Sequence, residues 1–220
     1  MSEPGRPTHR DVEIAGVETG FQGFLRLDVC RFRHRRFDGG WSALRRYDLL
    51  RVGSAVAVAL YDPDRDAVVL VEQLRLGALF AGAAPWQFEV AAGRADGDEP
   101  PATVAMRELR EETGLVPASA LIPIQRYLPS PGVSDESVLL YCARVDSTAA
   151  GGLHGLPDEG EDIRVAVKPM AEIETLLDAG MIENGHSLIA LYWLLRHRER
   201  LRRLWSTPPE TGVEQPRHRR

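Results

Sequence analysis

Cysteine and long apolar runs are both scarce in this chain of 220 residues. The two cysteines, Cys30 and Cys142, have no metal-ligand spacing, so they fit two ordinary buried or half-buried thiols in a reducing compartment. The longest apolar run, residues 188–195, is far too short to span a membrane, and no signal peptide precedes Arg10. We therefore expect a soluble, cytoplasmic protein without a membrane partner.

Lysine is nearly absent as well. Lys168 is the single lysine and the other basic residues among the 27 are arginines, which indicates a coding preference and not a nucleic-acid-binding patch. The formal net charge of −5 gives no general attraction to nucleic acid. A hydrophobic content of 44% is enough for a real core. We expect a globular protein without a nucleic-acid partner.

The most informative stretch is residues 93–115, which read GRADGDEPPATVAMRELREETGL. Pro100 and Pro101 suit the first turn of a helix, and Gly114 is the residue type that commonly ends one in the left-handed conformation. We predict a helix over residues 101–113. At about 100° per residue, one helix face is apolar and another acidic. The apolar set is Ala102, Ala105, Met106 and Leu109, and the acidic set is Glu108, Glu111 and Glu112.

The acidic face needs a partner, because like charges at i and i+4, such as Glu108 and Glu112, destabilise a helix by roughly 0.2–0.5 kcal/mol per pair. Salt bridges to Arg107 and Arg110 are one explanation. On the helical wheel, however, both arginines are expected to project away from the acidic arc. A hard divalent cation such as magnesium, which takes oxygen ligands and binds substrate phosphates, explains the cluster better.

The spacing in this stretch matches the pattern of the Nudix hydrolases. That pattern is glycine, five residues, glutamate, seven residues, and then Arg-Glu-aliphatic-any-Glu-Glu-any-Gly-aliphatic. With each of the seven fixed residue types at about 5–7% frequency, a chance match at one position is on the order of one in a billion. The chain therefore resembles the Nudix hydrolases, and the matching residues are Gly93, Glu99, Arg107, Glu108, Leu109, Glu111, Glu112, Gly114 and Leu115.

Outside this stretch, alternating and apolar runs predict strands around two or three helices. The expected strands are residues 11–14, 24–34, 41–51, 54–61, 67–74, 86–92, 120–128, 137–145 and 163–168. We expect turns at 38–40 and 129–132, a loop at 77–85, and helices at 169–179 and from a cap at Ser187 to about residue 205. The predicted fold class is α+β, an α/β/α sandwich that agrees with the Nudix resemblance.

The length suits one large domain or one domain with an appendage. The N-terminal strands would form a small antiparallel β-sheet that is marginal alone, so it must pack on the main domain or on a second copy of itself. We expect disorder at residues 1–8, the N-terminal β-sheet as a dimerisation region at 9–52, a Nudix catalytic domain at 53–205 and a disordered tail at 206–220.

Residues 146–162 form a long stretch with little regular pattern, and such loops are usually functional or disordered. Composition alone favours a solvated acidic loop tip. The sequence GLHGLPDEGEDIRV, residues 152–165, nevertheless closely resembles the corresponding loop of bacterial ADP-ribose pyrophosphatases, and this resemblance extends over about residues 11–205. It implies Mg2+-dependent hydrolysis of ADP-ribose to AMP and ribose 5-phosphate by a homodimer whose active sites are shared between subunits.

The same resemblance implies a metal site. The carbonyl oxygen of Ala92 and the carboxylates of Glu108 and Glu112 would bind Mg2+, for which Mn2+ would substitute. Glu161 in the acidic loop would be a further metal ligand. These oxygen ligands are of the kind that a hard divalent cation prefers.

The resemblance also assigns the proton chemistry and its supports. Glu159 would be the catalytic base, delivered by the loop once substrate is bound, while Glu111 would assist at the metal and is the alternative base. Glu99 would support the loop before the helix. Arg107 would pair with a motif carboxylate and orient it.

Substrate recognition is expected to involve other positions. Phe24 and Arg46 of the partner subunit would stack on adenine, which suits an aromatic ring and a planar cation. Judged without the resemblance, Phe24 could equally be sheet core and Arg75 a surface charge. The full set of substrate-binding candidates is Phe24, Arg46, Arg51, Arg75, Glu89, Arg94, Ser130, Gly132 and Glu136, with Arg75 and Arg94 on phosphate or ribose and the last three on the terminal ribose.

The chain departs from the subfamily pattern in two places. Residues 77–85 are more apolar than the pattern, and one residue is inserted near 51–54. Two alternative functions stay open: hydrolysis of another nucleotide sugar such as GDP-mannose, and a non-catalytic Nudix-like ligand sensor. The intact acidic motif and the lack of a basic helix-turn-helix segment speak against the sensor.

Overall fold

The computed structural model describes residues 9–206 except positions 96 and 98, and it leaves the side chain of Glu159 undescribed. The disorder expected at residues 1–8 therefore lies outside the described residues. So does the expected tail, apart from Ser206, which is the last residue of a helix.

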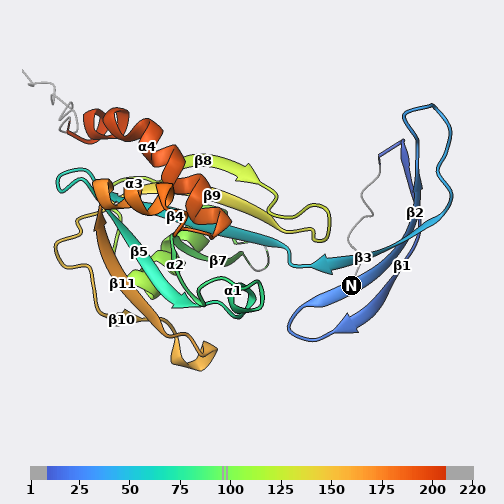
Figure 1. Ribbon diagram of the computed structural model, residues 1–220, viewed down its shortest axis with the longest axis horizontal. Coiled ribbons are helices and arrows are strands. Elements are labelled where there is room, and N and C mark those ends of the chain that lie inside the picture. The colour runs from blue at the N-terminus through green and yellow to red at the C-terminus, as the bar shows by residue number, and fades with distance from the viewer. Residues whose placement is uncertain (1–8, 96, 98, 207–220) are drawn as a thin grey trace, which may run out of the picture.

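The N-terminal segment forms a separate three-stranded antiparallel sheet in the order β1-β2-β3. Its strands are β1 (Val12–Gln22), β2 (Arg26–His34) and β3 (Arg45–Arg51), and the sheet extends away from the rest of the molecule (Figure 1). The turn expected at residues 38–40 is present, with Gly39 at φ +88°. The small antiparallel sheet predicted from the sequence is thus confirmed.

Three strand boundaries in this sheet differ from the prediction, the smallest difference being that β2 begins at Arg26 and not at residue 24. β1 continues to Gln22 instead of ending at residue 14, because register shifts between Ile14 and Gly16 and between Thr19 and Phe21 let it continue past its glycines. The return strand begins at Arg45 and not at residue 41. Trp41 makes only an isolated bridge to Arg35, whose guanidinium lies 4.5 Å from the indole centroid.

The core is a mixed eight-stranded sheet with helices on both faces (Figure 1). Successive residues of its central strand alternate between two apolar clusters: Val58 and Leu60 join the cluster on the side of the motif helix, while Ala59 and Tyr61 join the opposite one. The sandwich predicted from the sequence is confirmed. Its main strands are β4 (Ser54–Asp62), β5 (Ala67–Leu74), β8 (Ile122–Tyr127), β9 (Ser137–Arg144), β10 (Leu153–His154) and β11 (Ile163–Pro169).

The strand expected at residues 86–92 is in fact two strands, β6 (Trp86–Glu89) and β7 (Ala91–Ala95). β6 pairs with β5, whereas β7 pairs with β4. The reason is that β5 pairs with β4 only at residues 60–62 of β4, which leaves the same edge free at residues 54–58 for β7. This change of partner brings Gly93 to the middle of the sheet.

The motif helix α2 (Pro101–Thr113) has the predicted limits, and Gly114 ends it at φ +68°. Its buried face differs from the helical-wheel prediction. Val104, Ala105 and Leu109 are buried, together with the carboxylate residue Glu112, whereas Ala102 is exposed. The helix therefore packs with one glutamate turned toward the sheet.

Other helices complete the core. The loop expected at residues 77–85 contains the five-residue helix α1 (Leu76–Phe80), which buries none of its residues and so has no apolar periodicity to reveal it. The loop at 146–162 contains β10 and the 3-10 turn η1 (Pro157–Glu159). On the other face lie α3 (Met170–Asp178) and α4 (Gly185–Ser206). No helix in the described part of the chain is long and apolar enough to cross a membrane.

Ser187 does not cap α4 as predicted. The cap is Asn184, whose Oδ1 accepts the Ser187 N–H at 3.0 Å. The Ser187 hydroxyl donates to the same Oδ1 at 3.1 Å and accepts the Val90 N–H at 3.0 Å. The beginning of α4 is therefore tied to the point where β6 becomes β7.

Candidate active site

Two cavities meet at the start of β7. The acidic cavity, about 930 Å3, lies on the side of α2 and is lined by Phe24, Gln73, Leu74, Trp86, Arg107, Glu108, Gly160, Glu161 and Asp162. The histidine cavity, about 690 Å3, lies on the side of α4 and is lined by residues that include Gln87, Glu89, Glu136, Glu183, Asn184 and His186. Four residues line both cavities: Arg75, Ala92, Gly93 and Arg94.

Glu112 lies at the centre of the predicted metal site. It is only 3% exposed, and its Oε2 accepts the Ala92 N–H at 2.9 Å. The pKa of Glu112 is raised to about 8, chiefly by burial and also by the neighbouring carboxylates of Glu108 and Glu161, which together outweigh the lowering effect of the Ala92 hydrogen bond. Burial also raises the pKa of Glu108. The carboxylates of Glu108, Glu112 and Glu161 are thus close enough for the charge of one to raise the pKa of another.

Arg107 folds back over the acidic face, contrary to the helical-wheel expectation. Its guanidinium lies 2.9 Å from Glu108 Oε1 and 2.9 Å from Glu111 Oε2, and its Nε lies 3.9 Å from Glu99 Oε2. A long arginine side chain reaches a neighbouring arc of its own helix, which the position of Cα on a wheel does not show. The expected pairing of Arg107 with a motif carboxylate is confirmed, whereas Arg110 forms no ion pair among the described residues.

Gly93 is required where it stands. A Cβ at this position would lie 1.9 Å from Glu108 Cδ, far inside van der Waals contact. Glycine therefore lets the Glu108 carboxylate lie directly against the backbone of β7, next to Ala92.

The described residues do not form a complete metal-binding group, since no three of their His, Cys, Asp or Glu side chains converge closely enough. Glu108 is turned toward Arg107, and Glu112 toward a backbone N–H. The oxygen donors nevertheless suit a hard divalent cation. The carboxylates of Glu108 and Glu112 lie close together and both have raised pKa values, so a positive charge between them would be stabilising. Glu108, Glu112 and Glu161 with the Ala92 carbonyl are the residues that would hold it.

The acidic loop is attached to the end of α2. The Gly155 N–H donates to the Glu111 carbonyl oxygen at 3.3 Å, and the His154 ring lies so close to Gly114 that a Cβ there would be 2.9 Å from His154 Cε1. Glu161 lines the acidic cavity, and its Oε2 accepts the Leu156 N–H at 3.0 Å. The backbone of Glu159 lies in η1, but its side chain is outside the described part, so its role as the base stays a prediction.

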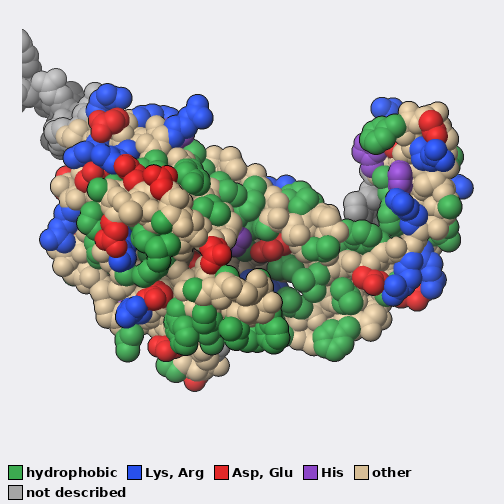
Figure 2. Space-filling view, in the orientation of Figure 1, with side chains coloured by type: hydrophobic (Ala, Val, Ile, Leu, Met, Phe, Trp, Pro, Cys, Tyr) green, Lys and Arg blue, Asp and Glu red, His purple; other side chains and the backbone are tan. Residues whose placement is uncertain are grey.

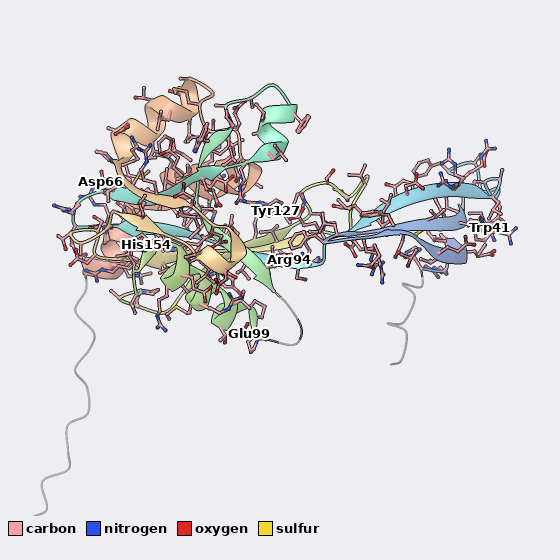
Figure 3. All side chains as sticks on the ribbon, turned by 90° about the horizontal axis from the view of Figure 1, so that it is seen from below. Trp41, Asp66, Arg94, Glu99, Tyr127 and His154 are labelled. Atoms are coloured by element: carbon pink, nitrogen blue, oxygen red, sulfur yellow. The ribbon has the colours of Figure 1, made fainter. Side chains whose placement is uncertain are left out.

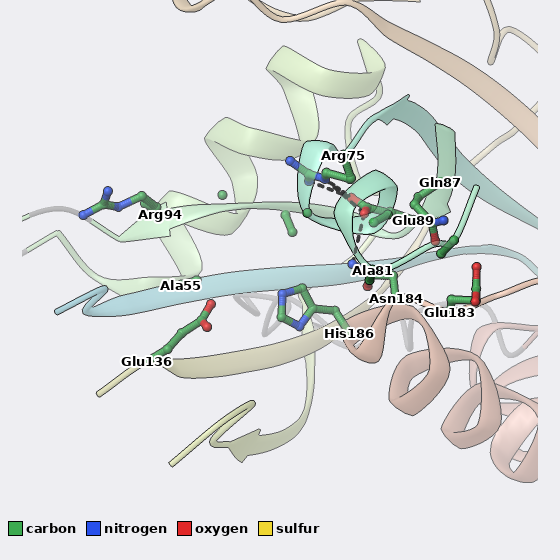
Figure 4. A pocket seen from close by; sticks show the side chains of 15 residues that line it. Ala55, Arg75, Ala81, Gln87, Glu89, Arg94, Glu136, Glu183, Asn184 and His186 are labelled. Carbon is green, nitrogen blue, oxygen red and sulfur yellow. Dashed lines mark hydrogen bonds and ion pairs between the residues drawn. The ribbon is translucent and has the colours of Figure 1, made fainter. Parts of the chain in front are cut away.

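Arg75 and Glu89 form a pair between the two cavities. Glu89 is 2% exposed and accepts from Arg75 Nη2 at 2.6 Å and from Asn184 Nδ2 at 3.0 Å. The dashed contacts in Figure 4 show this pair above His186. The carboxylate of Glu89 therefore holds the Arg75 guanidinium in position where the two cavities meet.

Phe24 lies at the acidic cavity of its own chain and is 90% exposed, so the sheet-core alternative is wrong. Its ring lies 5.4 Å from the guanidinium carbon of Arg94. Figure 3 shows Arg94 on the side of the core that faces the N-terminal sheet. Arg46 is paired with Asp48 at 3.0 Å on β3 and lines neither cavity.

Of the three residues expected at the terminal ribose, Glu136 alone lines a cavity, the histidine cavity. The Ser130 carbonyl accepts the Ser134 N–H at 3.0 Å, and the Gly132 carbonyl accepts the Tyr47 hydroxyl. Both belong to the junction between the core and the N-terminal sheet.

Arg51 belongs to the same junction. Its Nε lies 2.9 Å from Asp135 Oδ2 and 3.9 Å from Asp28 Oδ2. The structure thus places Arg51 in a contact between the sheet and the core, outside both cavities.

Some cavity residues were missed by sequence reasoning. His186 and Asn184 looked like ordinary residues at the start of an apolar helix, and Trp86 and Gln87 like parts of a strand. No local signal distinguishes them, because they reach the cavities only through the packing of α4 and β6 around β7.

The chain belongs to the Nudix family, since the model of the NUDIX domain matches residues 51–192. Among characterised relatives it is 41% identical to an ADP-ribose pyrophosphatase of Escherichia coli strain K12, over 89% of this chain and 93% of that protein. It is 31% identical to a GDP-mannose pyrophosphatase of Citrobacter koseri, over 64% of this chain and 73% of that protein. The fold resembles the crystal structure of an ADP compounds hydrolase, with a TM-score of 0.66 and 20% identity over 87% of this chain and 98% of the other.

Proposed function

We propose that this protein hydrolyses ADP-ribose to AMP and ribose 5-phosphate with the help of Mg2+, for which Mn2+ substitutes. The observation that supports this most is the meeting of two cavities at Arg75, Gly93 and Arg94, next to the Glu108 and Glu112 carboxylates. A diphosphate bound at this ridge would place the nucleoside in one cavity and the sugar in the other. The similarity to an ADP-ribose pyrophosphatase over most of the chain supports the choice of substrate.

The chemistry needs charge neutralisation, because a diphosphate repels an attacking hydroxide. Glu108, Glu112, Glu161 and the Ala92 carbonyl would hold a divalent cation, which would supply that neutralisation and lower the pKa of the attacking water. Arg75, fixed by Glu89, orients the phosphate groups from the other side.

The water oxygen then bonds to a phosphorus atom while the bridging P–O bond breaks, and the water proton moves to a carboxylate. Glu159 is our candidate for that base, with Glu111 as the alternative. The Glu111 carboxylate is held by Arg107, 2.9 Å away, and its residue does not line the acidic cavity among the described residues. Because Arg107 engages Glu111, Glu159 stays our first candidate.

We also propose that residues 9–52 form a dimerisation region, that residues 53–205 form the catalytic domain, and that Arg46 acts in the partner's site. The limits of the strands support this division, because β3 ends at Arg51 and β4 begins at Ser54. Since Phe24 already lies at the cavity of its own chain, Arg46 alone needs to come from the partner for the two to stack on one adenine. The cytoplasmic location stays a prediction.

The test is a turnover assay of the purified protein on a panel of ADP-ribose, GDP-mannose and ADP-glucose. We expect ADP-ribose to give the highest kcat/KM, AMP and ribose 5-phosphate as products, loss of activity with a chelator, and recovery with Mg2+ or Mn2+. In water enriched in oxygen-18, the label should enter one product phosphate. Preference for GDP-mannose would contradict the substrate, and no turnover of any member would favour the ligand sensor.

A further inference from the structure

His186 is a titratable side chain of the histidine cavity that the proposed chemistry does not use. His186, in the first turn of α4, lines this cavity together with Glu136, which precedes β9. Figure 4 shows the two side chains beside each other, across from Arg75 and Glu89. The ridge at Arg75, Gly93 and Arg94, where the two cavities meet, lies between them and the metal-site carboxylates.

The hydrogen bond to Tyr127 determines which nitrogen of His186 carries the proton. The Tyr127 hydroxyl contacts His186 Nδ1, and the two rings lie edge to face with centroids 5.8 Å apart. Burial, with the nearby Glu136 charge, raises the pKa of Tyr127, so the phenol keeps its proton and donates. Burial lowers the pKa of His186, so the imidazole is neutral and Nδ1 accepts. The proton of the imidazole is then on Nε2.

A protonated Nε2 gives the cavity a hydrogen-bond donor beside an acceptor. Among the described residues, no hydrogen bond to Nε2 and no side-chain hydrogen bond or ion pair of Glu136 is present. A sugar hydroxyl suits this pair, because it accepts from an N–H while a neighbouring hydroxyl donates to a carboxylate. A phosphate does not, since the Glu136 charge repels it.

We propose that His186 is a specificity-determining residue, whose Nε2–H donates to a hydroxyl oxygen of the sugar on the side of the diphosphate opposite the nucleoside. Tyr127 acts through it as a positioning residue, because its O–H fixes the imidazole tautomer. Glu136 accepts from the same sugar. This inference rests on the proposed function, in that it presumes a nucleoside diphosphate sugar across the ridge.

The simplest alternative is that His186 and Tyr127 only fill space under α4. The two readings differ in what a substitution changes. A space-filling residue affects the stability of the fold, whereas a hydrogen-bond donor affects binding of the sugar half alone. Loss of one neutral hydrogen bond corresponds to an affinity change of about 3- to 10-fold.

The experiment measures KM and kcat for ADP-ribose, together with inhibition by each product, for four variants. In His186→Ala and His186→Leu we expect KM to rise about 3- to 10-fold with little change in kcat, weaker inhibition by ribose 5-phosphate, and unchanged inhibition by AMP. His186→Gln should recover much of the loss, since its amide N–H reaches near the position of Nε2. Tyr127→Phe should change the same quantities in the same direction by a smaller factor.

His197→Ala is the matched control, because His197 lies on the same helix, lines neither cavity, and has its Nδ1 2.7 Å from the Trp193 carbonyl oxygen. Thermal unfolding of every variant separates a binding effect from a folding effect. Equal loss of inhibition by AMP and ribose 5-phosphate, unchanged KM in both His186→Ala and His186→Leu, or no recovery in a folded His186→Gln overturns the inference. A wild-type protein that does not cleave ADP-ribose contradicts the proposed function instead.

Discussion

At the scale of single residues, Glu112 shows how a metal site and a folded core compete. A glutamate packed with Val104 and Leu109 against a sheet carries a desolvation cost, which the Ala92 N–H only partly offsets. Burial raises its pKa from the usual value of 4.5 to about 8. The protein without a metal ion therefore prefers a protonated Glu112, whereas metal binding requires the carboxylate.

This difference predicts how stability depends on pH. Because the folded-state pKa of Glu112 is higher than the unfolded one, the folded state binds the extra proton, and stability without metal falls as the pH rises from 4.5 to about 8. In the presence of chelator, we expect the Tm of Glu112→Gln to fall less than that of the wild type between pH 5.5 and pH 8.5. We expect its kcat to be about 100-fold or more below the wild-type value. Thermal unfolding and turnover check both, and near-normal turnover of this variant would remove Glu112 from the metal site.

Gly93 allows a second prediction at this scale. In Gly93→Ala the new methyl group would occupy the position of the Glu108 carboxylate and displace it, so we expect kcat to fall by about 100-fold or more while the chain still folds. Gly16→Ala is the control, because a Cβ there meets nothing within 4 Å. Turnover and circular dichroism distinguish the two outcomes, and a Gly93→Ala enzyme with full activity would mean that Glu108 need not lie against β7.

At the scale of elements, the site depends on how the acidic loop is attached to α2. The contact of His154 with Gly114 and the hydrogen bond from the Gly155 N–H to the Glu111 carbonyl oxygen join β10 and the residue after it to the end of the motif helix. The glycine that ends the helix thus has a second use, since its missing side chain makes room for the His154 ring. The loop that carries Glu159 and Glu161 extends directly from this contact.

Removing the His154 ring should therefore loosen the loop more than the core. In His154→Ala we expect kcat to fall by about 10-fold and the amide hydrogens of Gly155 and Glu161 to exchange faster, with core amides unchanged. Leu153→Ala is the matched control on the same strand, because Leu153 is exposed. Hydrogen exchange by mass spectrometry checks the local effect. Unchanged exchange across residues 155–161 would show that the loop is held by other contacts.

At the scale of the whole molecule, the N-terminal sheet has too little packing to be independent. It joins the core through a short junction in which Asp135 Oδ1 accepts the N–H groups of Val52 and Gly53 at 2.8 and 3.2 Å. Phe21 on the sheet and Leu76 and Phe80 on α1 are exposed, and Figure 2 shows hydrophobic side chains gathered over the lower face near α1. Exposed apolar surface of this kind is typical of contacts between subunits.

We therefore predict a homodimer, with a scattering mass about twice the chain mass of 24.4 kDa. If Arg46 acts in the partner's site, a mixture of Arg46→Ala and Glu112→Gln dimers, each impaired by itself, should regain up to about one quarter of wild-type activity after subunit exchange. Half of the dimers would then be mixed, and each mixed dimer would carry one intact site out of two. No recovery would mean that Arg46 acts in the active site of its own chain or in neither site. A fully active monomer would contradict shared sites altogether.

Local sequence was sufficient for features that a few neighbouring residues decide. The limits of α2 follow from Pro101 and Gly114, and the strands β5 and β9 follow from short apolar runs. Capping, backbone preference and hydrophobic periodicity act over a few neighbouring residues, so the local sequence contains them. The spacing of Glu108 and Glu112 on one helix also follows from the sequence, and with it the expectation of a divalent cation.

Tertiary structure decided everything that depends on distant partners. β6 and β7 separate because β5 leaves part of the β4 edge unpaired, and Gly132 joins the N-terminal sheet because Tyr47 reaches it from β3. His186 enters the cavity because α4 begins beside β7, tied there by Asn184 and Ser187. Such contacts join residues far apart in the chain, so no local pattern of the sequence contains them, and only the packing of the sheet and its helices determines them.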